Sequence, residues 1–327
     1  MNIKEIIKDL QCFCLDLESF WRIFRIEHSA KFRKTKLLGE IIRNTHSIEK
    51  GLSLKDVRLG FGLAKFRDTN KVIEEYVSLG GILQVDQILM FMDAMKGYLD
   101  FHDEKNFTNK DVEEVARLYE SLCKKVHFKA VGKLGGVLKI SKRQYSREQK
   151  DLLAEVFINR HSVRDFANTP VNEECLRNAI ELAMHCPSAC NRQCQRLYIV
   201  DRKDFHKIDG WLNGTGGFGE SLGKLLFVTA NMSVYRRYEM LQWVVTGSIF
   251  AAYLSLALEI FNIGSCFVQR PILPNKKWRN MASKLNIPED EQIVCCIGIG
   301  NLKETYTVPV SHRLPLDEIV TFVDFKK

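Results

Sequence analysis

The sequence predicts a mixed fold in two parts: a helical N-terminal region, then an α+β or α/β layered region around a modest sheet. Apolar residues recur at three- and four-residue spacings from the N-terminus to about residue 128. From residue 146 onward, helical segments alternate with short β-rich runs. Between them, residues 129–145 combine glycines with basic residues, as a linker does. We therefore divide the chain into regions 1–145 and 146–327.

The N-terminal region should consist of amphipathic helices. Two apolar stripes are formed by Ile3, Ile6, Ile7, Leu10, Cys14 and Leu17, and by Leu37, Leu38, Ile41 and Ile42. Gly51 should stop the second helix, and further helices are expected over residues 85–102 and 111–126. Residues 20–25 mix aromatic and basic side chains, which would allow contact with a membrane surface but is more typical of a docking face.

A capping box should open the second region. Ser146 is followed three residues later by Gln149, ahead of an apolar face formed by Leu152, Leu153, Val156 and Phe157. Beyond this helix, we expect strands over residues 196–201, 225–230, 264–269 and 292–300, and helices over 173–185, 205–212, 239–262 and 276–285.

Composition and charge indicate a globular protein of a reducing compartment. Apolar residues make up 46% and charged residues 27% of the 327 residues, which excludes a disordered chain. Several of the ten cysteines lie in apolar runs and the N-terminus lacks an export signal, so we expect a cytoplasmic protein. Residues 1–67 contain 14 Lys and Arg against 8 Asp and Glu, which favours an anionic neighbour for this region.

One segment, residues 243–261, reaches transmembrane length. Thr246, Ser248 and Ser255 interrupt it, and Glu259 lies in its last turn, where a charge within a membrane span would be costly. We interpret it as a helix buried in the core or in a subunit interface.

The most informative motif is Arg160-His161-Ser162-Val163-Arg164, which stands where an amphipathic segment ends. Two guanidiniums separated by a serine can hold one multiply charged oxyanion, because arginine pairs bidentately with phosphate and a hydroxyl fills remaining lone pairs. Taken alone, the same string is more often a solvated basic turn.

Other motifs give weaker predictions. Residues 214–219 have GxGxxG spacing but follow a predicted helix, whereas a dinucleotide site needs a strand there. Cys186, Cys190 and Cys194 lack a fourth ligand at zinc-like spacing. His46 and Glu49 lie one turn apart without a second such pair. We therefore predict neither a dinucleotide fingerprint nor a metal site.

A second loop favours interpreting the first motif as a binding site and not as a solvated turn. Residues 187–193, Pro-Ser-Ala-Cys-Asn-Arg-Gln, follow a predicted helix and precede a predicted strand. A loop of this composition can present amide and hydroxyl groups to a planar ring. The order of the two motifs, followed by Arg313 in a Ser-His-Arg-Leu-Pro string, resembles the nitroreductase family of flavin mononucleotide (FMN) enzymes. The resemblance covers residues 147–323.

This resemblance implies a fold, a cofactor and a set of site residues. The fold would be α+β, layered α/β/α with a mostly antiparallel sheet. FMN would be bound across a homodimer interface, with the helix over residues 243–261 in that interface. The phosphate, ribityl chain and ring would contact Arg160, His161, Ser162 and Arg164, with Pro187, Ser188, Ala189 and Asn191 from the partner subunit and Arg313 as a second phosphate arginine.

The chain departs from the family pattern at two places. Cys194, Gln195 and Arg196 stand where the family usually has an aromatic residue. After the strand predicted at 264–269, residues 269–271 are Gln-Arg-Pro, without the glycine whose backbone commonly meets the reactive flavin nitrogen. The long N-terminal region is also absent from the short members of the family.

The implied function is two-step hydride transfer from NADH or NADPH through FMN to an unidentified acceptor, such as a quinone, a nitro compound or another small organic molecule. No side chain is then needed as general acid or base, because the cofactor carries the chemistry. We expect no nucleic-acid partner. The alternative is a non-enzymatic flavin-binding or docking protein associated with a biosynthetic, for example polysaccharide-forming, complex. Flavin-dependent dehydrogenation of a sugar- or peptide-derived substrate is a further alternative.

Overall fold

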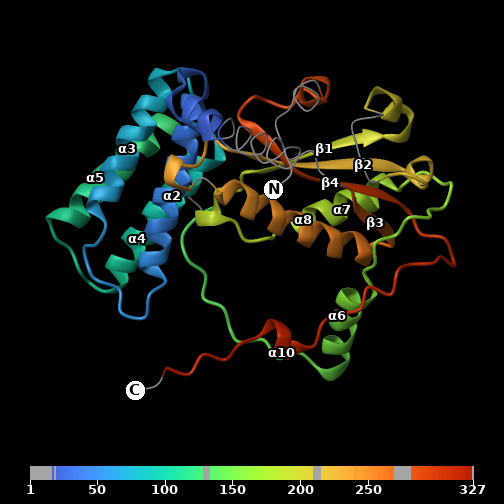
Figure 1. The fold of residues 1–327 in the computed structure, drawn as a ribbon. Helices are drawn as coiled ribbons and strands as arrows, with labels where there is room; N and C mark the ends of the chain where they lie inside the picture. The colour runs from blue at the N-terminus through green and yellow to red at the C-terminus, as the bar shows by residue number, and fades with distance from the viewer. Residues whose placement is uncertain are drawn as a thin grey trace.

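The computed structural model describes residues 17, 20–127, 133–208, 215–239, 241–268 and 281–325. Four helices form the body of the N-terminal region: α2 (Arg33–Leu52), α3 (Leu63–Ser78), α4 (Asp86–Glu104) and α5 (Lys110–Val126). They surround one apolar core that includes Leu37, Phe66, Phe91, Tyr98 and Val115 (Figure 1). The helices expected over residues 85–102 and 111–126 are thus confirmed, whereas α3 was not predicted. The stripe at residues 3–14 lies outside the described residues.

The end of α2 differs from the prediction. Gly51 does not stop the helix, which continues to Leu52 and is capped at Ser53. The glycine is needed for space, because a Cβ atom there would collide with the Phe61 ring. Its role is therefore close packing of a neighbouring loop.

The described part of the N-terminal segment is helical over residues 20–28. Arg22 turns toward the second region, where its Nη2 donates to the Glu289 and Glu291 carbonyl oxygens at 2.7 and 2.8 Å. Phe20 and Trp21 are exposed. Arg22, one of the two arginines of this segment, therefore serves an intramolecular contact.

The chain leaves the helical region along a fixed path. The buried Asp93 carboxylate accepts hydrogen bonds from the backbone N–H groups of Lys133 and Leu134 at 3.0 and 2.8 Å. Glu49 accepts another from the Gly136 N–H at 3.1 Å. Residues 137–146 then run without regular structure to α6 (Arg147–Asn159), where the Ser146–Gln149 capping box forms as predicted.

A four-stranded sheet forms the centre of the second region. Its strands are β1 (Gln195–Asp201), β2 (Lys224–Asn231), β3 (Ile263–Val268) and β4 (Glu291–Asn301), in the order β1-β2-β4-β3. All pairs are antiparallel, with Leu226 opposite Ile297 at the centre and a register shift between Val228 and Thr229. The four predicted strands are confirmed, although residue 269 lies outside the described residues.

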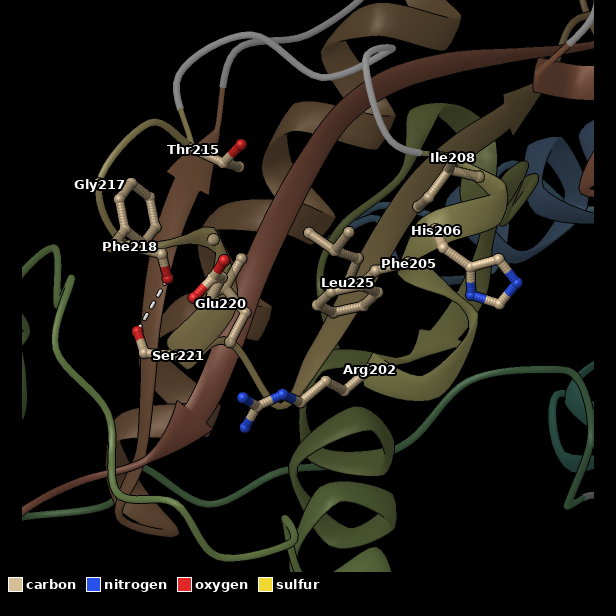
Figure 2. Close-up of a pocket in the computed structure, with 12 residues that line it drawn as sticks. Arg202, Phe205, His206, Ile208, Thr215, Gly217, Phe218, Glu220, Ser221 and Leu225 are labelled. Carbon is tan, nitrogen blue, oxygen red and sulfur yellow. Dashed lines mark hydrogen bonds between the residues drawn. The ribbon is translucent and has the colours of Figure 1, made fainter.

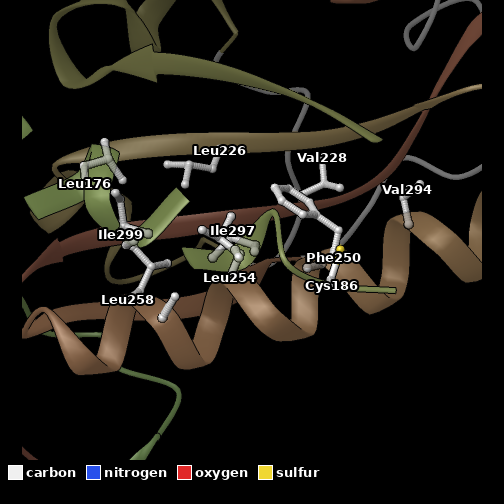
Figure 3. Close-up of a cluster of buried hydrophobic side chains, with 14 of the residues drawn as sticks. Leu176, Cys186, Leu226, Val228, Phe250, Leu254, Leu258, Val294, Ile297 and Ile299 are labelled. Carbon is white, nitrogen blue, oxygen red and sulfur yellow. The ribbon is translucent and has the colours of Figure 1, made fainter. Parts of the chain in front are cut away.

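Helices α7 (Glu173–Ala183) and α8 (Gln242–Ile260) cover one face of the sheet (Figure 1). Phe250, Leu254 and Leu258 of α8 point toward the strands, where they meet Leu226 and Ile297 (Figure 3). A separate apolar cluster covers other parts of the sheet and includes Phe205, Phe227, Met281, Ile287 and Cys296. Helices and an antiparallel sheet after a helical N-terminal region confirm the predicted α+β class.

Helix α8 is the segment that the sequence placed at transmembrane length. Among the described helices, it alone is long and apolar enough to cross a bilayer. Its sheet-facing side is buried in the core, which accounts for its apolar composition as the sequence suggested. Its other side, which includes Val245, Tyr253 and Ile260, is exposed.

One predicted helix differs from the structure, and another lies only partly within the described residues. Instead of an α-helix over residues 205–212, the chain forms a 3-10 helix at Arg202–Lys207, and residues 209–212 lie outside the described residues. So short a segment cannot repay the cost of starting an α-helix. Of the helix expected over 276–285, residues 281–284 are helical, and 276–280 are not described.

Candidate functional site

The Arg160–Arg164 motif runs along the edge of the sheet. Arg160 caps the C-terminus of α6, and the chain then extends beside β3, where Ser162 forms a parallel bridge with Ser265. The Val163 N–H donates to the Ser265 carbonyl at 3.0 Å, and the Val163 side chain is buried. Because side chains alternate along an extended segment, Ser162 and Arg164 lie on the side opposite this anchor.

The local electrostatics identify the neighbours of this motif. Burial raises the pKa of the Glu259 carboxyl, and Arg160 and His161 oppose that rise. Burial likewise raises the pKa of the Cys266 thiol on β3, against the effect of Arg164, Arg160 and the Ser162 hydroxyl. The motif therefore lies beside Cys266 of β3, and Arg160 and His161 are close enough to Glu259 in the last turn of α8 to influence its pKa.

Among the described residues, no carboxylate oxygen lies within 4 Å of the Arg160 or Arg164 guanidinium, although the Glu259 carboxyl is near enough for Arg160 to oppose the rise that burial causes in its pKa. The acidic residue that follows the motif, Asp165, is paired with Lys303 at 2.5 Å. Arg160 is half-buried and Arg164 exposed. The arrangement can therefore accept an anionic group.

The second motif forms a tightly bent loop. Cys190, Asn191 and Gln193 have φ angles of 52°, 54° and 45°, a left-handed conformation that costs about 1–3 kcal/mol for each such residue. Ser188 holds the bend, since its Oγ accepts from the Gln193 N–H at 3.1 Å and its carbonyl from the Asn191 N–H at 2.9 Å. Pro187 and Asn191 are exposed, while Ser188 and Ala189 are half-buried.

Arg192 anchors this loop, a role that the sequence analysis did not predict. Its side chain is buried and pairs with both Glu239 carboxylate oxygens at 2.8 and 2.6 Å. Its Nε donates to the Ala189 carbonyl at 3.0 Å, and its Nη1 to the Val234 carbonyl at 3.2 Å. The guanidinium also stacks on the Tyr235 ring, 4.2 Å from its centroid.

The two motifs lie at opposite ends of α8 in one chain. The loop contacts Tyr235 through Arg192, and the Tyr235 hydroxyl meets the Thr246 hydroxyl at 2.9 Å in the second turn of α8. Burial raises the pKa of Glu259, which lies thirteen residues further along the helix, and Arg160 and His161 of the first motif oppose that rise. At 1.5 Å per residue, Thr246 and Glu259 are about 20 Å apart. One copy of the chain does not bring the two predicted halves of the site together.

Arg313 stands on a C-terminal segment that leaves the sheet and runs past the short helix α10 (Leu316–Ile319) (Figure 1). Its side chain is exposed and donates to the Ser311 carbonyl. This hydrogen bond stays within the C-terminal segment.

Three apolar surfaces around these motifs are exposed. Helix α6 buries none of its residues, although Leu152 and Phe157 belong to its predicted apolar face. The outer side of α8 and the C-terminal segment, with Phe322 and Phe325, are exposed as well. Exposed apolar side chains of this number can mark an interaction site where they lie together.

The weaker motifs occupy other places. Residue 214 lies outside the described residues, and residues 215–219 precede β2, the reverse of the order that a dinucleotide fingerprint needs. They line a pocket of about 740 Å³ together with Arg202, Phe205 and His206 (Figure 2). Within the described ranges, no group of three or more His, Cys, Asp or Glu residues could hold a metal ion. The His46 Nδ1 lies 3.6 Å from a Glu49 carboxylate oxygen, one helical turn away.

Residues 158–214, which contain both motifs, match the model of the nitroreductase family. The chain carries a nitroreductase-family region. The match confirms the resemblance predicted from the order of the motifs. Of the two departures from the family pattern, Cys194 is fully buried in the nitroreductase region and its sulfur accepts from the Tyr235 hydroxyl at 3.3 Å. Residues 269–271 lie outside the described residues.

Solved structures that resemble the chain align with about half of it. They include an FMN-dependent nitroreductase from Clostridium difficile, with 20% identity over 53% of this chain and 99% of that one, and a TM-score of 0.45. A nitroreductase family protein from Streptococcus pneumoniae has 19% identity, coverages of 52% and 99%, and a TM-score of 0.44. A nitroreductase with bound FMN from Bacteroides fragilis has 14% identity over 53% of this chain and 98% of that one, and a TM-score of 0.43. No curated protein matches the chain.

Proposed function

We propose that the protein is an FMN-dependent oxidoreductase. The observation that carries the proposal is the group formed by Arg160, Ser162 and Arg164 at the edge of β3, within the family-matched segment. Neither guanidinium has a carboxylate within salt-bridge distance among the described residues, and the neighbouring Asp165 is paired with Lys303. This is the donor set that a phosphate monoester requires.

The residues of this group would divide the binding of FMN among them. Arg160 and Arg164 would pair with the phosphate oxygens, and the Ser162 hydroxyl would donate to a remaining oxygen, with about 1.5–3 kcal/mol for each charge-assisted contact. His161, half-buried beside Glu259, would face the ribityl chain or ring. Bound FMN would supply the hydride-transfer chemistry between NADH or NADPH and a small acceptor such as a quinone or nitro compound.

We further propose that the second half of the site comes from another copy of the chain. The Pro187–Asn191 loop is about 20 Å from the first motif along α8, so Ser188, Ala189 and Asn191 would serve the cofactor bound by the partner subunit. The exposed apolar surfaces of α6 and α8 support a homodimer, and Arg313 would add a second phosphate contact once the C-terminal segment packs.

The division into regions 1–145 and 146–327 and a cytoplasmic location remain proposals. The described cysteines are all free thiols, as a reducing compartment favours.

The proposed function is tested on the purified protein. It should be yellow, release FMN on denaturation, and oxidise NADH or NADPH when a quinone or nitroaromatic acceptor is added. A yellow protein that oxidises neither nicotinamide with any acceptor would favour the non-enzymatic alternative. A colourless protein that does not bind added FMN would contradict both.

A further inference from the structure

Helix α2 has two packed sides, and only one of them belongs to the N-terminal core. Leu37, Ile41 and Ile48 face the other helices of that region. Gly39, on the opposite side, lies directly against Val234 of the second region. A Cβ atom at residue 39 would be 2.9 Å from the Val234 Cβ and 3.0 Å from its Cα, closer than side chains pack. The two backbones therefore meet at this point with no space between them.

Helix α2 also contacts the Pro187–Asn191 loop, which belongs to the second motif. It packs against the Ala189–Asn191 turn, at the end of α8 that carries Thr246 (Figure 1). Glu40 approaches Arg236 at 3.9 Å, and Arg43 contributes to lowering the pKa of Glu239, after the larger effect of the Arg192 hydrogen bond. Residues of α2 thus line both the loop and the segment that anchors it.

A chain of contacts leads from α2 into the loop. Gly39 sets the position of Val234, whose carbonyl accepts from Arg192. Arg192 is fixed on the other side by Glu239 and holds the Ala189 carbonyl. The loop itself has three residues in left-handed conformations, and such a shape persists only where surrounding contacts over-determine it.

We propose that the N-terminal helical region is a positioning element of the FMN site, acting through α2. In this proposal, Gly39, Arg192 and Glu239 are positioning residues: they fix the Pro187–Asn191 loop in the shape that it presents to the FMN of the partner subunit. The inference rests on the proposed function. It assigns the helical region a structural task at the cofactor, where the sequence analysis suggested only docking.

A pair of glycine substitutions tests this proposal. Gly39→Ala and Gly97→Ala each add one methyl group to a helix of the same region and raise its intrinsic helix propensity alike. At Gly97 the new Cβ would have no neighbour closer than the Gly136 Cα at 3.8 Å, so this variant is the matched control. Only the change at Gly39 forces α2 away from Val234.

The readouts are the Kd for FMN and the visible circular dichroism of the bound flavin, both measured well below the unfolding temperature. We expect Gly39→Ala to raise the Kd at least about tenfold, close to 1.4 kcal/mol, and to change the visible spectrum, while the control matches the wild type. A general loss of stability would not alter the spectrum of the fraction that stays bound.

A second variant keeps the test decisive if Gly39→Ala does not fold. Arg192→Lys keeps the charge but loses the two-point pairing with Glu239, and should raise the Kd in the same way. If the wild type binds FMN and both folded variants bind it equally well with unchanged spectra, the positioning role is wrong. If the wild type binds no FMN, the proposed function itself fails.

Discussion

Arg192 and Glu239 form a two-point ion pair, with nitrogen–oxygen distances of 2.8 and 2.6 Å, whose arginine is withdrawn from solvent. The pair joins the loop after α7 to the segment before α8. Removal of Glu239 would leave the Arg192 charge buried and unpaired, at a cost of about 3–5 kcal/mol.

Replacement of Arg192 by methionine should therefore lower the free energy of unfolding by about 3 kcal/mol or more, because Glu239 would lose its partner in a poorly solvated place. Urea denaturation followed by circular dichroism measures the change. Arg177→Met, at an exposed position of α7, should leave the free energy of unfolding within about 0.5 kcal/mol of the wild-type value. Equal stabilities of the two variants would contradict the assigned pair.

The same pair predicts a dependence of stability on pH. The hydrogen bond from Arg192 holds the pKa of Glu239 below its ordinary value of 4.5. Because the folded-state pKa is the lower one, the stabilisation is present above the ordinary value and is lost as the pH falls through the folded-state value. The stability gap between the wild type and Glu239→Gln should narrow as the pH is lowered from 6 toward 3 in a denaturation series. A gap that stays constant would show that the carboxylate charge contributes nothing.

The exposed side of α8 should be part of a subunit interface. Tyr253→Glu places a charge on this surface, where Tyr253 is 42% exposed, and should shift the protein from dimer to monomer and weaken FMN binding. Val77→Glu makes the same kind of change on α3, where Val77 is 39% exposed, and should leave the protein a dimer in solution. Analytical ultracentrifugation separates the outcomes, and a wild type that sediments as a monomer would refute the interface.

Loss of phosphate contacts should weaken FMN binding strongly. Arg160→Ala combined with Arg313→Ala removes two charge-assisted contacts of about 1.5–3 kcal/mol each, so the Kd should rise about a hundredfold or more. Fluorescence titration with FMN measures it, and Arg177→Ala controls for the loss of an exposed arginine. An unchanged Kd in the double variant would mean that these arginines do not hold the phosphate.

Much of the fold could be predicted from local patterns. The four strands were placed within about one residue because their runs are apolar and β-rich, and β2 is buried along its whole length. Helix α3 was missed because Thr69 occupies one of its core positions, where its hydroxyl is satisfied by the Lys65 carbonyl at 2.7 Å. This threonine interrupts the three- and four-residue spacing of apolar residues in the sequence, yet its side chain is buried in the core with its hydroxyl hydrogen-bonded.

The candidate site shows a different limit. Arg160, Ser162 and Arg164 stand close together in the chain, so their grouping into one motif could be predicted, whereas its place at the edge of β3 could not. Arg192 and Glu239 are 47 residues apart, and their contact depends on how α8 packs against the sheet. No spacing in the sequence indicates such a pair. For the same reason, the contact of Gly39 with Val234 emerges only from the packed structure.

The central claim is that Arg160, Ser162 and Arg164 hold a phosphate, and comparison of FMN with riboflavin tests it most directly. Riboflavin has the same ring and ribityl chain without the phosphate. Calorimetric titration of the flavin-free protein should give FMN at least about a hundredfold tighter than riboflavin, and Arg160→Ala with Arg164→Ala should remove most of that difference. Equal affinities of the wild type for the two flavins, or no binding of either, would contradict the account.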